Sequence, residues 1–281
     1  GRSGTQWFVY FAGQRWRGSK QSKGSAIEMT HPRAQKLSAF LMLLSFLLFT
    51  QCEESPEAPD VKINPFERAG WTLTWQDEFD ADSLDQSAWI VAHGHWSHNG
   101  EEQYYAPDEV YLHEGSLRLR SRYRQYESQN YTSGHVKSYY FQRYGRIDIS
   151  ARLPGTRGMW PALWLLPVSG AWPPEIDILE LIGHDPRTIH MSTHWGPLSD
   201  GKPPWELGQT ATQHYSGPDF TVDFHLFSLE WYPDSLRWLV DDEVQFVSQV
   251  GIPHEPMYLI MNTAVGGGWP GSPDQTTIFP Q

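Results

Sequence analysis

The stretch Glu175-Ile176-Asp177-Ile178-Leu179-Glu180 places three carboxylates among apolar residues. In a β-strand successive side chains point to opposite faces, so Glu175 and Asp177 share one face. Strict alternation would turn Glu180 to the other face, among the isoleucines, where a lone carboxylate is costly to bury. We therefore expect a β-bulge after Asp177, because one extra residue returns Glu180 to the face of the other two acids.

Two glutamates on one face of a strand suit acid–base chemistry at a sugar bond. The Cα atoms of Glu175 and Glu180 would lie about 13 Å apart at about 3.4 Å per residue. Side chains leaning together can bring the carboxyl groups to about 5 Å, the separation of a retaining glycoside hydrolase and too short for an inverting one. Asp177 adds negative charge that keeps one neighbour protonated near neutral pH. The alternative is a calcium site or an acidic edge strand, but metal loops usually carry Gly and Asn between their acids.

Several other segments carry patterns that occur together in one protein family. In chain order they are WTLTWQDEF at 71–79, NGEEQYY at 99–105, the run 144–154, GMWPALW at 158–164, THWG at 193–196, the run 224–231 and NTAVGGGWPGSP at 262–273. Together with the Glu-x-Asp-x-x-Glu pattern they resemble glycoside hydrolase family 16, in particular its bulged, laminarinase-type endo-β-1,3-glucanases. The resemblance covers about residues 70–281.

The resemblance implies a role for each acid. Glu175 is expected to be the nucleophile, Glu180 the general acid/base and Asp177 the residue that orients and tunes them, whereas the residues alone do not decide which glutamate does which. The sugar-binding cleft is expected to contain Asn99, Arg146, Trp160, Trp164, His194, Asn262 and Trp269. No cofactor is expected to be required and no metal in the catalytic site, and a structural calcium ion stays open.

The spacing of apolar residues predicts an all-β protein. Short alternating runs such as 116–122, 145–153 and 227–231 are bounded by Gly, Pro, Asp or Asn, and 232–235 reads as a hairpin turn. No amphipathic helix of ordinary length is evident. We expect an antiparallel two-sheet β-sandwich of jelly-roll type, with a concave substrate cleft as the resemblance implies. The segment 196–220, rich in Gly, Pro and polar residues, predicts a loop beside this cleft.

The N-terminal part of the chain reads as export and anchoring signals. Residues 29–52 combine a basic start with a short apolar run and end at Cys52, and they resemble a lipoprotein signal peptide with a relaxed lipobox. Residues 53–68, rich in Glu and Pro, predict a tether. We expect a lipid-anchored protein of the outer membrane or cell surface, or otherwise a secreted one.

The remaining boundaries follow from these segments. Residues 1–28 precede Met29 and are interpreted as translated upstream sequence rather than a domain. Residues 69–281 form the predicted sandwich domain. Members of the resembled family continue into one more strand, so we expect an open sheet edge near the opening strand.

Composition restricts the partners. Of the 21 Lys+Arg and 33 Asp+Glu, the first 52 residues hold 7 and 1, so the remainder carries 14 basic and 32 acidic groups and a net charge of −18. Such a surface repels polyanions, which argues against nucleic acid and favours a neutral polysaccharide. The single cysteine allows no intrachain disulfide. We expect a monomer.

The resulting hypothesis is an endo-acting, retaining hydrolase of β-1,3-glucan. Mixed-linkage β-1,3-1,4-glucan or an algal galactan is the alternative substrate, and transfer to a sugar hydroxyl is an alternative outcome. A surface lectin that binds glycans without cutting them is a further alternative, although such proteins typically lose the paired glutamates.

Overall fold

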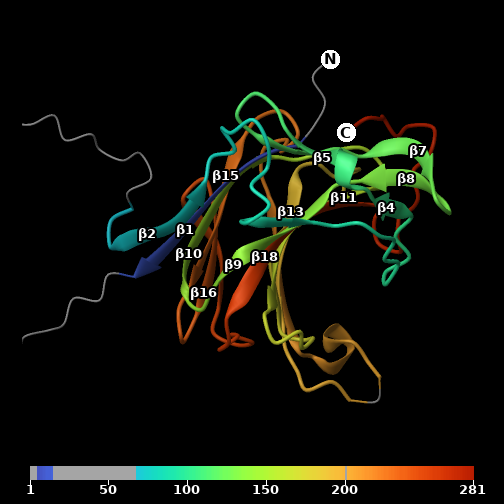
Figure 1. Cartoon of the computed structure of the whole chain (residues 1–281). Helices are drawn as coiled ribbons and strands as arrows, with labels where there is room; N and C mark the ends of the chain where they lie inside the picture. Colours follow the sequence, from blue (N-terminus) through green and yellow to red (C-terminus); the bar gives the residue numbers. More distant parts are fainter. Residues whose placement is uncertain (1–4, 15–67, 200) are drawn as a thin grey trace, which may run out of the picture. The chain divides into compact units, whose positions relative to one another are not determined.

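The computed structural model describes residues 5–14, 68–199 and 201–281 (Figure 1). Within them the helical elements are two short 3-10 helices, η1 (Pro107–Glu109) and η2 (Pro204–Leu207). No helix in this part of the chain is long and apolar enough to cross a lipid bilayer. Cys52, the predicted signal peptide and residues 53–67 of the predicted tether lie outside the described residues.

Two large antiparallel sheets make up most of the described chain. Sheet A contains β1 (Thr5–Gln14), β2 (Trp71–Asp77), β5 (Val110–Leu112), β6 (Leu117–Leu119), β10 (Gly145–Arg152), β15 (His225–Trp231), β16 (Leu236–Val240) and β17 (Glu243–Ser248). Sheet B contains β3 (Trp89–Val91), β9 (His135–Gln142), β11 (Met159–Pro167), β12 (Glu175–Leu181), β13 (Thr188–His194), β14 (Thr210–Ser216) and β18 (Met257–Val265). A small sheet C holds β4 (Gln103–Tyr105), β7 (Arg122–Tyr126) and β8 (Gln129–Ser133).

The order of strands in sheet B positions the functional residues. It runs β14-β13-β12-β11-β18-β9-β3, so β12, which carries the three acids, is flanked by β11 and β13. Sheet A has the order β17-β16-β15-β10-β1-β6-β5, with β2 also paired to β1. The predicted all-β, antiparallel two-sheet sandwich of jelly-roll type is confirmed.

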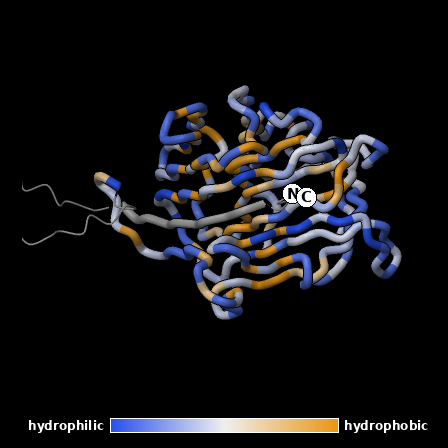
Figure 2. The backbone as a smooth tube through the Cα atoms, turned by 90° about the horizontal axis from the view of Figure 1, so that it is seen from above, coloured by the Kyte–Doolittle hydropathy of each residue, from blue (hydrophilic) through white to orange (hydrophobic). Residues whose placement is uncertain are grey.

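Alternation along the strands builds the core between the two sheets. From β10 and β15, Ile147, Ile149 and Leu229 are buried in one apolar cluster. From sheet B, Ile176 and Leu259 join the same cluster. Polar residues between them point away from the core, and this alternation is visible as changes from blue to orange along the strands in Figure 2. The period of two therefore fixes which face of sheet B is apolar and which is left for chemistry.

The segment 196–220 differs from its prediction, because only part of it is loop. Residues 210–216 form strand β14, which pairs with β13 over its whole length. Its sequence, TATQHYS, alternates with few apolar residues because β14 is the edge strand of sheet B. A strand without a buried apolar face carries a weak sequence signal. Outside β14, the described residues of the predicted loop are 196–199, 201–209 and 217–220.

Residues 1–28, interpreted from the sequence as translated upstream sequence rather than a domain, include one described strand, β1. This strand lies in the interior of sheet A. One edge of β1 pairs with β10 over residues 6–12, and the other pairs with β6 over 5–7 and with β2 over 9–14. The opening strand β2, beside which an open edge was expected, is therefore paired. The sequence did not indicate this pairing, because 56 residues lie between the end of β1 and the start of β2.

Candidate active site

The bulge predicted after Asp177 is present in β12. Toward β13, Asp177 pairs with Ser192 and Glu180 with His190, so three steps along β12 match two along β13. Toward β11 the register shifts at the same place, and Ile178 is left without a partner in either ladder. One extra residue in the strand reverses the alternation that follows it.

The bulge brings the three acids to one face of sheet B, here called the carboxylate face. Glu175 and Glu180 are partly exposed, whereas Asp177 between them is only 2% exposed. The apolar neighbours in β12 are buried in the core on the opposite side: Ile176, Ile178, Leu179 and Leu181. The core therefore packs against the apolar face of β12, and the three acids project from the opposite face.

Neighbouring side chains orient each acid. The indole Nε1 of Trp172 donates to Glu175 Oε2 at 2.7 Å, and that of Trp160 donates to Glu180 Oε1 at 3.0 Å. Asp177 Oδ2 lies 3.1 Å from the Nε2 atom of His194. Each glutamate thus keeps one carboxyl oxygen that no indole engages.

The electrostatics of the site favour protonated glutamates. Burial raises the pKa of Glu180 well above its ordinary value, and the charge of Asp177 raises it further, while the Trp160 hydrogen bond lowers it. Burial and Asp177 likewise raise the pKa of Glu175, against the hydrogen bond from Trp172. Because the three carboxyls interact, the apparent pKa values belong to the group. Such a group releases its protons in steps, and the raised pKa values place these steps at higher pH than for an isolated glutamate.

The structure brings most of the predicted binding residues to this face. Trp160 and His194 contact the acids directly, and Trp269 lies against Trp160 with ring centroids 5.5 Å apart. Next to them, Trp164 Nε1 donates to Asn262 Oδ1 at 2.7 Å.

Asn99 borders the same site through its backbone. Its carbonyl oxygen accepts the Gly268 N–H at 2.9 Å, which ties it to the loop that carries Trp269. The Asn99 side chain donates to Glu101 at 3.2 Å. Asn99 therefore supports this wall of the site, while its amide is already engaged with a neighbour.

Arg146 is not part of the site, and its predicted place in the cleft is wrong. It lies on β10 in sheet A, where its guanidinium is buried and contacts Asp148 at 2.7 Å, Glu230 at 3.0 Å and Asp242 at 2.6 Å. The flanking residue Ile147 faces the core, so alternation turns Arg146 to the outer face of sheet A. A family motif can indicate that a residue is functionally or structurally important. It does not determine which of the two sheets contains that residue.

Sequence reasoning missed three residues of the site. Trp172, which is 45% exposed, donates to Glu175, and Tyr105 receives a hydrogen bond from Asn262 at 3.0 Å. His190 is paired across the strands with Glu180. Trp172 could have been found from its position three residues before Glu175. Tyr105 lies in the recognised segment 99–105, but His190 is identified only by the strand register.

One grouping of metal-ligating side chains occurs in the described part of the chain. Glu175, Asp177 and His194 each offer a ligand atom within 4.8 Å of the others. These atoms already have protein neighbours, because Trp172 donates to Glu175 and the imidazole of His194 lies against Asp177. His194 Nδ1 in turn lies 2.8 Å from the Thr210 hydroxyl. Glu175, Asp177 and His194 are therefore residues of the carboxylate site itself rather than of a separate site.

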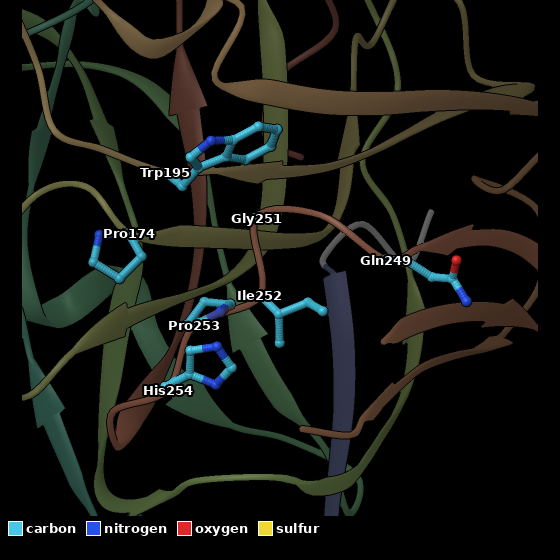
Figure 3. Close-up of a pocket in the computed structure, with 7 residues that line it drawn as sticks. All are labelled: Pro174, Trp195, Gln249, Gly251, Ile252, Pro253 and His254. Carbon is cyan, nitrogen blue, oxygen red and sulfur yellow. The ribbon is translucent and has the colours of Figure 1, made fainter. Parts of the chain in front are cut away.

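A separate pocket opens near the start of β12 but is not the carboxylate site. Pro174, Trp195, Gln249, Pro253 and His254 line it, as Figure 3 shows. None of the three acids is among its lining residues.

The comparisons with known proteins agree with this geometry. The sequence profile described as "Glycosyl hydrolases family 16" matches residues 75–279. A "Beta-glucanase" of Rhodothermus marinus is 35% identical over 233 residues, which cover 72% of this chain and 78% of the relative. A "Glucan endo-1,3-beta-glucosidase A1" of Niallia circulans is 32% identical and is covered over 35% of its length, against 72% of this chain.

Solved structures show the same relationship in three dimensions. The laminarinase catalytic domain from Thermotoga maritima superimposes with a TM-score of 0.67 at 36% sequence identity, covering 75% of this chain and 93% of that domain. The three acids on one face of β12 are thus found in a chain whose sequence matches the family profile over most of its length. The two related sequences and the shared fold point to the same family. The chain belongs to glycosyl hydrolases family 16.

Proposed function

We propose that the protein is a retaining endo-hydrolase of β-1,3-glucan that works by double displacement. The observation that carries the proposal is the bulge in β12, which puts Glu175, Asp177 and Glu180 on one face with the pKa values of both glutamates raised. Similarity to proteins named as laminarinase and endo-1,3-β-glucosidase supports the choice of substrate.

In the first step, Glu175 attacks the anomeric carbon of the sugar that will be retained. The bond from that carbon to the glycosidic oxygen breaks as Glu180 gives its proton to the oxygen, and the leaving part of the chain departs. In the second step, Glu180 removes a proton from water, and the resulting oxygen nucleophile displaces Glu175 from the anomeric carbon. Two inversions give net retention.

Asp177 supports this cycle through its charge. It is buried between the two glutamates and raises the pKa of each. Glu180 therefore keeps a proton at a pH at which an isolated glutamate, with a pKa of about 4.3, would have lost it. His194, which lies against Asp177 and is hydrogen-bonded to Thr210, holds the aspartate in place.

Substituting each glutamate by alanine tests the function and the assignment of roles. We expect both variants to lose hydrolysis of laminarin. With an aryl β-laminarioligosaccharide and azide, Glu175→Ala should give the α-glycosyl azide, because azide enters from the face that Glu175 occupied. Glu180→Ala should give the β-glycosyl azide, because azide there attacks the glycosyl-enzyme. Exchanged configurations would reverse the roles, and unimpaired hydrolysis in either variant would refute the mechanism.

The choice of polysaccharide is tested on the unmodified enzyme. Reducing ends should be released from laminarin and not from agarose or porphyran, and cleavage of lichenan would extend the substrate to mixed-linkage glucan. Binding to these glycans without any release would identify a lectin instead.

We further propose that Cys52 is lipidated and anchors a monomeric enzyme at the cell surface or outer membrane. The basic and apolar run before Cys52 and the Glu- and Pro-rich segment after it support this. Metabolic labelling with a radioactive fatty acid should mark the protein, and Cys52→Ala should remove the label. Labelling that persists in this variant would exclude Cys52, and light scattering would test the monomer.

A further inference from the structure

Two histidines lie directly opposite each other on strands β13 and β14. His190 pairs with Glu180 of β12 on one side and with His214 of β14 on the other. Residues opposite each other in an antiparallel pair project to the same face, with Cβ atoms about 4.5–5.5 Å apart. The imidazoles of His190 and His214 meet edge to face, with ring centroids 4.5 Å apart and planes at 76°. The mechanism above gives neither ring a role.

The His190 ring has a nitrogen without a partner. Its Nδ1 atom is buried and has no hydrogen-bond partner within the described structure, which costs free energy that a bound ligand recovers. Desolvation lowers the pKa of His190 to about 4, with a further decrease from His214 and an opposing increase from Asp185. The ring is therefore neutral near pH 7, and the neutral imidazole is the form that binds metal ions. His214 is exposed, so solvent reaches the pair.

Negative charge near the pair favours a cation. The charge of Asp185 acts on the His190 ring, because it raises the pKa of that imidazole. Glu180 lies across the strands from His190 and keeps one carboxyl oxygen that no indole engages. A positive ion held by the two imidazoles is therefore attracted by acidic groups on the neighbouring backbone.

The donor atoms select the kind of ion. Imidazole nitrogens suit Zn²⁺, Cu²⁺ and Ni²⁺, whereas Ca²⁺ and Mg²⁺ take oxygen ligands. An ion about 2.0–2.1 Å from one nitrogen of each ring fits between imidazoles at the observed separation when the two rings turn toward it. Water completes the coordination shell, so the ion exchanges with solvent, unlike a structural zinc ion enclosed by protein ligands.

The grouping of Glu175, Asp177 and His194 on the same face is a poorer site for such an ion. Both ring nitrogens of His194 already have neighbours, Asp177 at 3.1 Å and the Thr210 hydroxyl at 2.8 Å. An ion at this grouping has to displace these contacts. The Nδ1 atom of His190 has no such contact to lose.

We propose that His190 and His214 together bind one Zn²⁺ or Cu²⁺ ion on the carboxylate face. The ion takes no part in bond cleavage. Bound beside Glu180, it obstructs the approach of a substrate to that residue and so inhibits the enzyme. The metal site is independent of the proposed function, whereas the inhibition rests on it.

Calorimetry with Zn²⁺ tests the site without any substrate. We expect His214→Ala to bind Zn²⁺ at least about 10-fold more weakly than the unmodified protein, since even outer-shell changes at a metal site cost about 10–100-fold in affinity. His113→Ala is the matched control, because it removes an exposed histidine from the turn between β5 and β6, and it should bind like the unmodified protein. With Cu²⁺, electron paramagnetic resonance of the unmodified protein should show coupling to two imidazole nitrogens, which His214→Ala should lose.

Equal Zn²⁺ affinity and stoichiometry in the unmodified protein and in His214→Ala would overturn the site. An equal loss of affinity in His113→Ala would do the same, because the effect would then not belong to the pair.

Inhibition is a separate measurement. Zn²⁺ should inhibit laminarin hydrolysis, and His214→Ala, as active as the unmodified enzyme without metal, should need at least about 10-fold more Zn²⁺ for the same inhibition. Zn²⁺ binding at the pair without inhibition would refute the obstruction of Glu180 and support the site. If the unmodified protein without metal does not cut β-1,3-glucan, the proposed function fails, and the calorimetry still decides the metal site.

Discussion

At the scale of the residue, Glu180 is a carboxyl group whose surroundings oppose its ionisation. Burial and the neighbouring Asp177 both raise its pKa, and the single indole hydrogen bond from Trp160 is the opposing influence. A general acid benefits from this balance, since it must still hold its proton at the working pH. The same balance has consequences for the pH profile and for stability.

Trp160→Phe should move the basic limb of the pH profile to higher pH. The indole N–H stabilises the ionised form of Glu180, so its removal raises the pKa of the acid further. The measurement is kcat/KM for laminarin across pH, for the variant and the unmodified enzyme. Trp164→Phe serves as the control, because its indole donates to Asn262 instead. A basic limb that moves to lower pH would contradict the assigned effect of this bond.

Glu180→Gln should abolish hydrolysis and stabilise the fold near neutral pH. Because the pKa is raised in the folded state, the native protein binds the proton more tightly than the unfolded chain does. Stability therefore falls as pH rises from about 4.3, the unfolded value, through the folded pKa. Glutamine avoids this loss, so we expect a gain of about 1 kcal/mol, or Tm higher by about 2–4 °C at pH 7.

The pH dependence of that gain is its control. Below about pH 4 the carboxyl is neutral in both states, so Tm of the variant and of the unmodified protein should converge. A difference that is the same at pH 3.5 and pH 7 would show that ionisation of Glu180 is not its source.

At the scale of the element, the bulge in β12 decides which face each side chain occupies. Ile178 is the extra residue, and both neighbouring strands shift register around it. Before the bulge the odd-numbered positions face the acids' side, and after it the even-numbered ones do. This single irregularity lets one strand contribute three acids to one face and four apolar residues to the core.

Inserting one alanine after Ile178 should shift the alternation by one position and turn Glu180 away from the other acids. We expect hydrolysis to fall by at least about 10²–10⁴-fold, the contribution of a positioned general acid. Ile178→Val is the matched control, because it keeps the bulge and should cost only about 0.5–1.5 kcal/mol in stability. Laminarin hydrolysis and thermal unfolding of both variants provide the measurement. A folded insertion variant with undiminished activity would contradict the role of the bulge.

At the scale of the whole molecule, the sandwich is completed by a strand from the far N-terminal end of the chain. β1 lies between β10 on one side and β6 and β2 on the other. Its backbone hydrogen bonds therefore link β10 to β6 and β2, which do not pair with β10 themselves. An interior strand satisfies backbone groups on both of its edges. Its loss would expose three strands at once.

Val9→Pro should therefore destabilise the sandwich, whereas Ser3→Pro, which lies before β1, should not. Proline in an interior strand removes a ladder hydrogen bond and is not tolerated there. By analogy with proline inside a helix, the expected loss is about 3 kcal/mol, and Tm should fall by roughly 6–12 °C. Differential scanning calorimetry of both variants measures this. The same Tm in both would show that β1 does not contribute to the stability of sheet A.

The local pattern of residues was enough to predict much of this protein. Alternation predicted a two-sheet sandwich, and the cost of burying Glu180 predicted the bulge, because both depend on neighbours in the chain. The position of Arg146, the partnership of His190 with Glu180 and the strand β1 depended on pairing between distant segments. Side-chain direction is set by the backbone a few residues away, whereas the register between strands is set by the packing of the whole core. For that reason the sequence by itself determined the catalytic strand and its acids, and only the tertiary structure decided which other residues meet them.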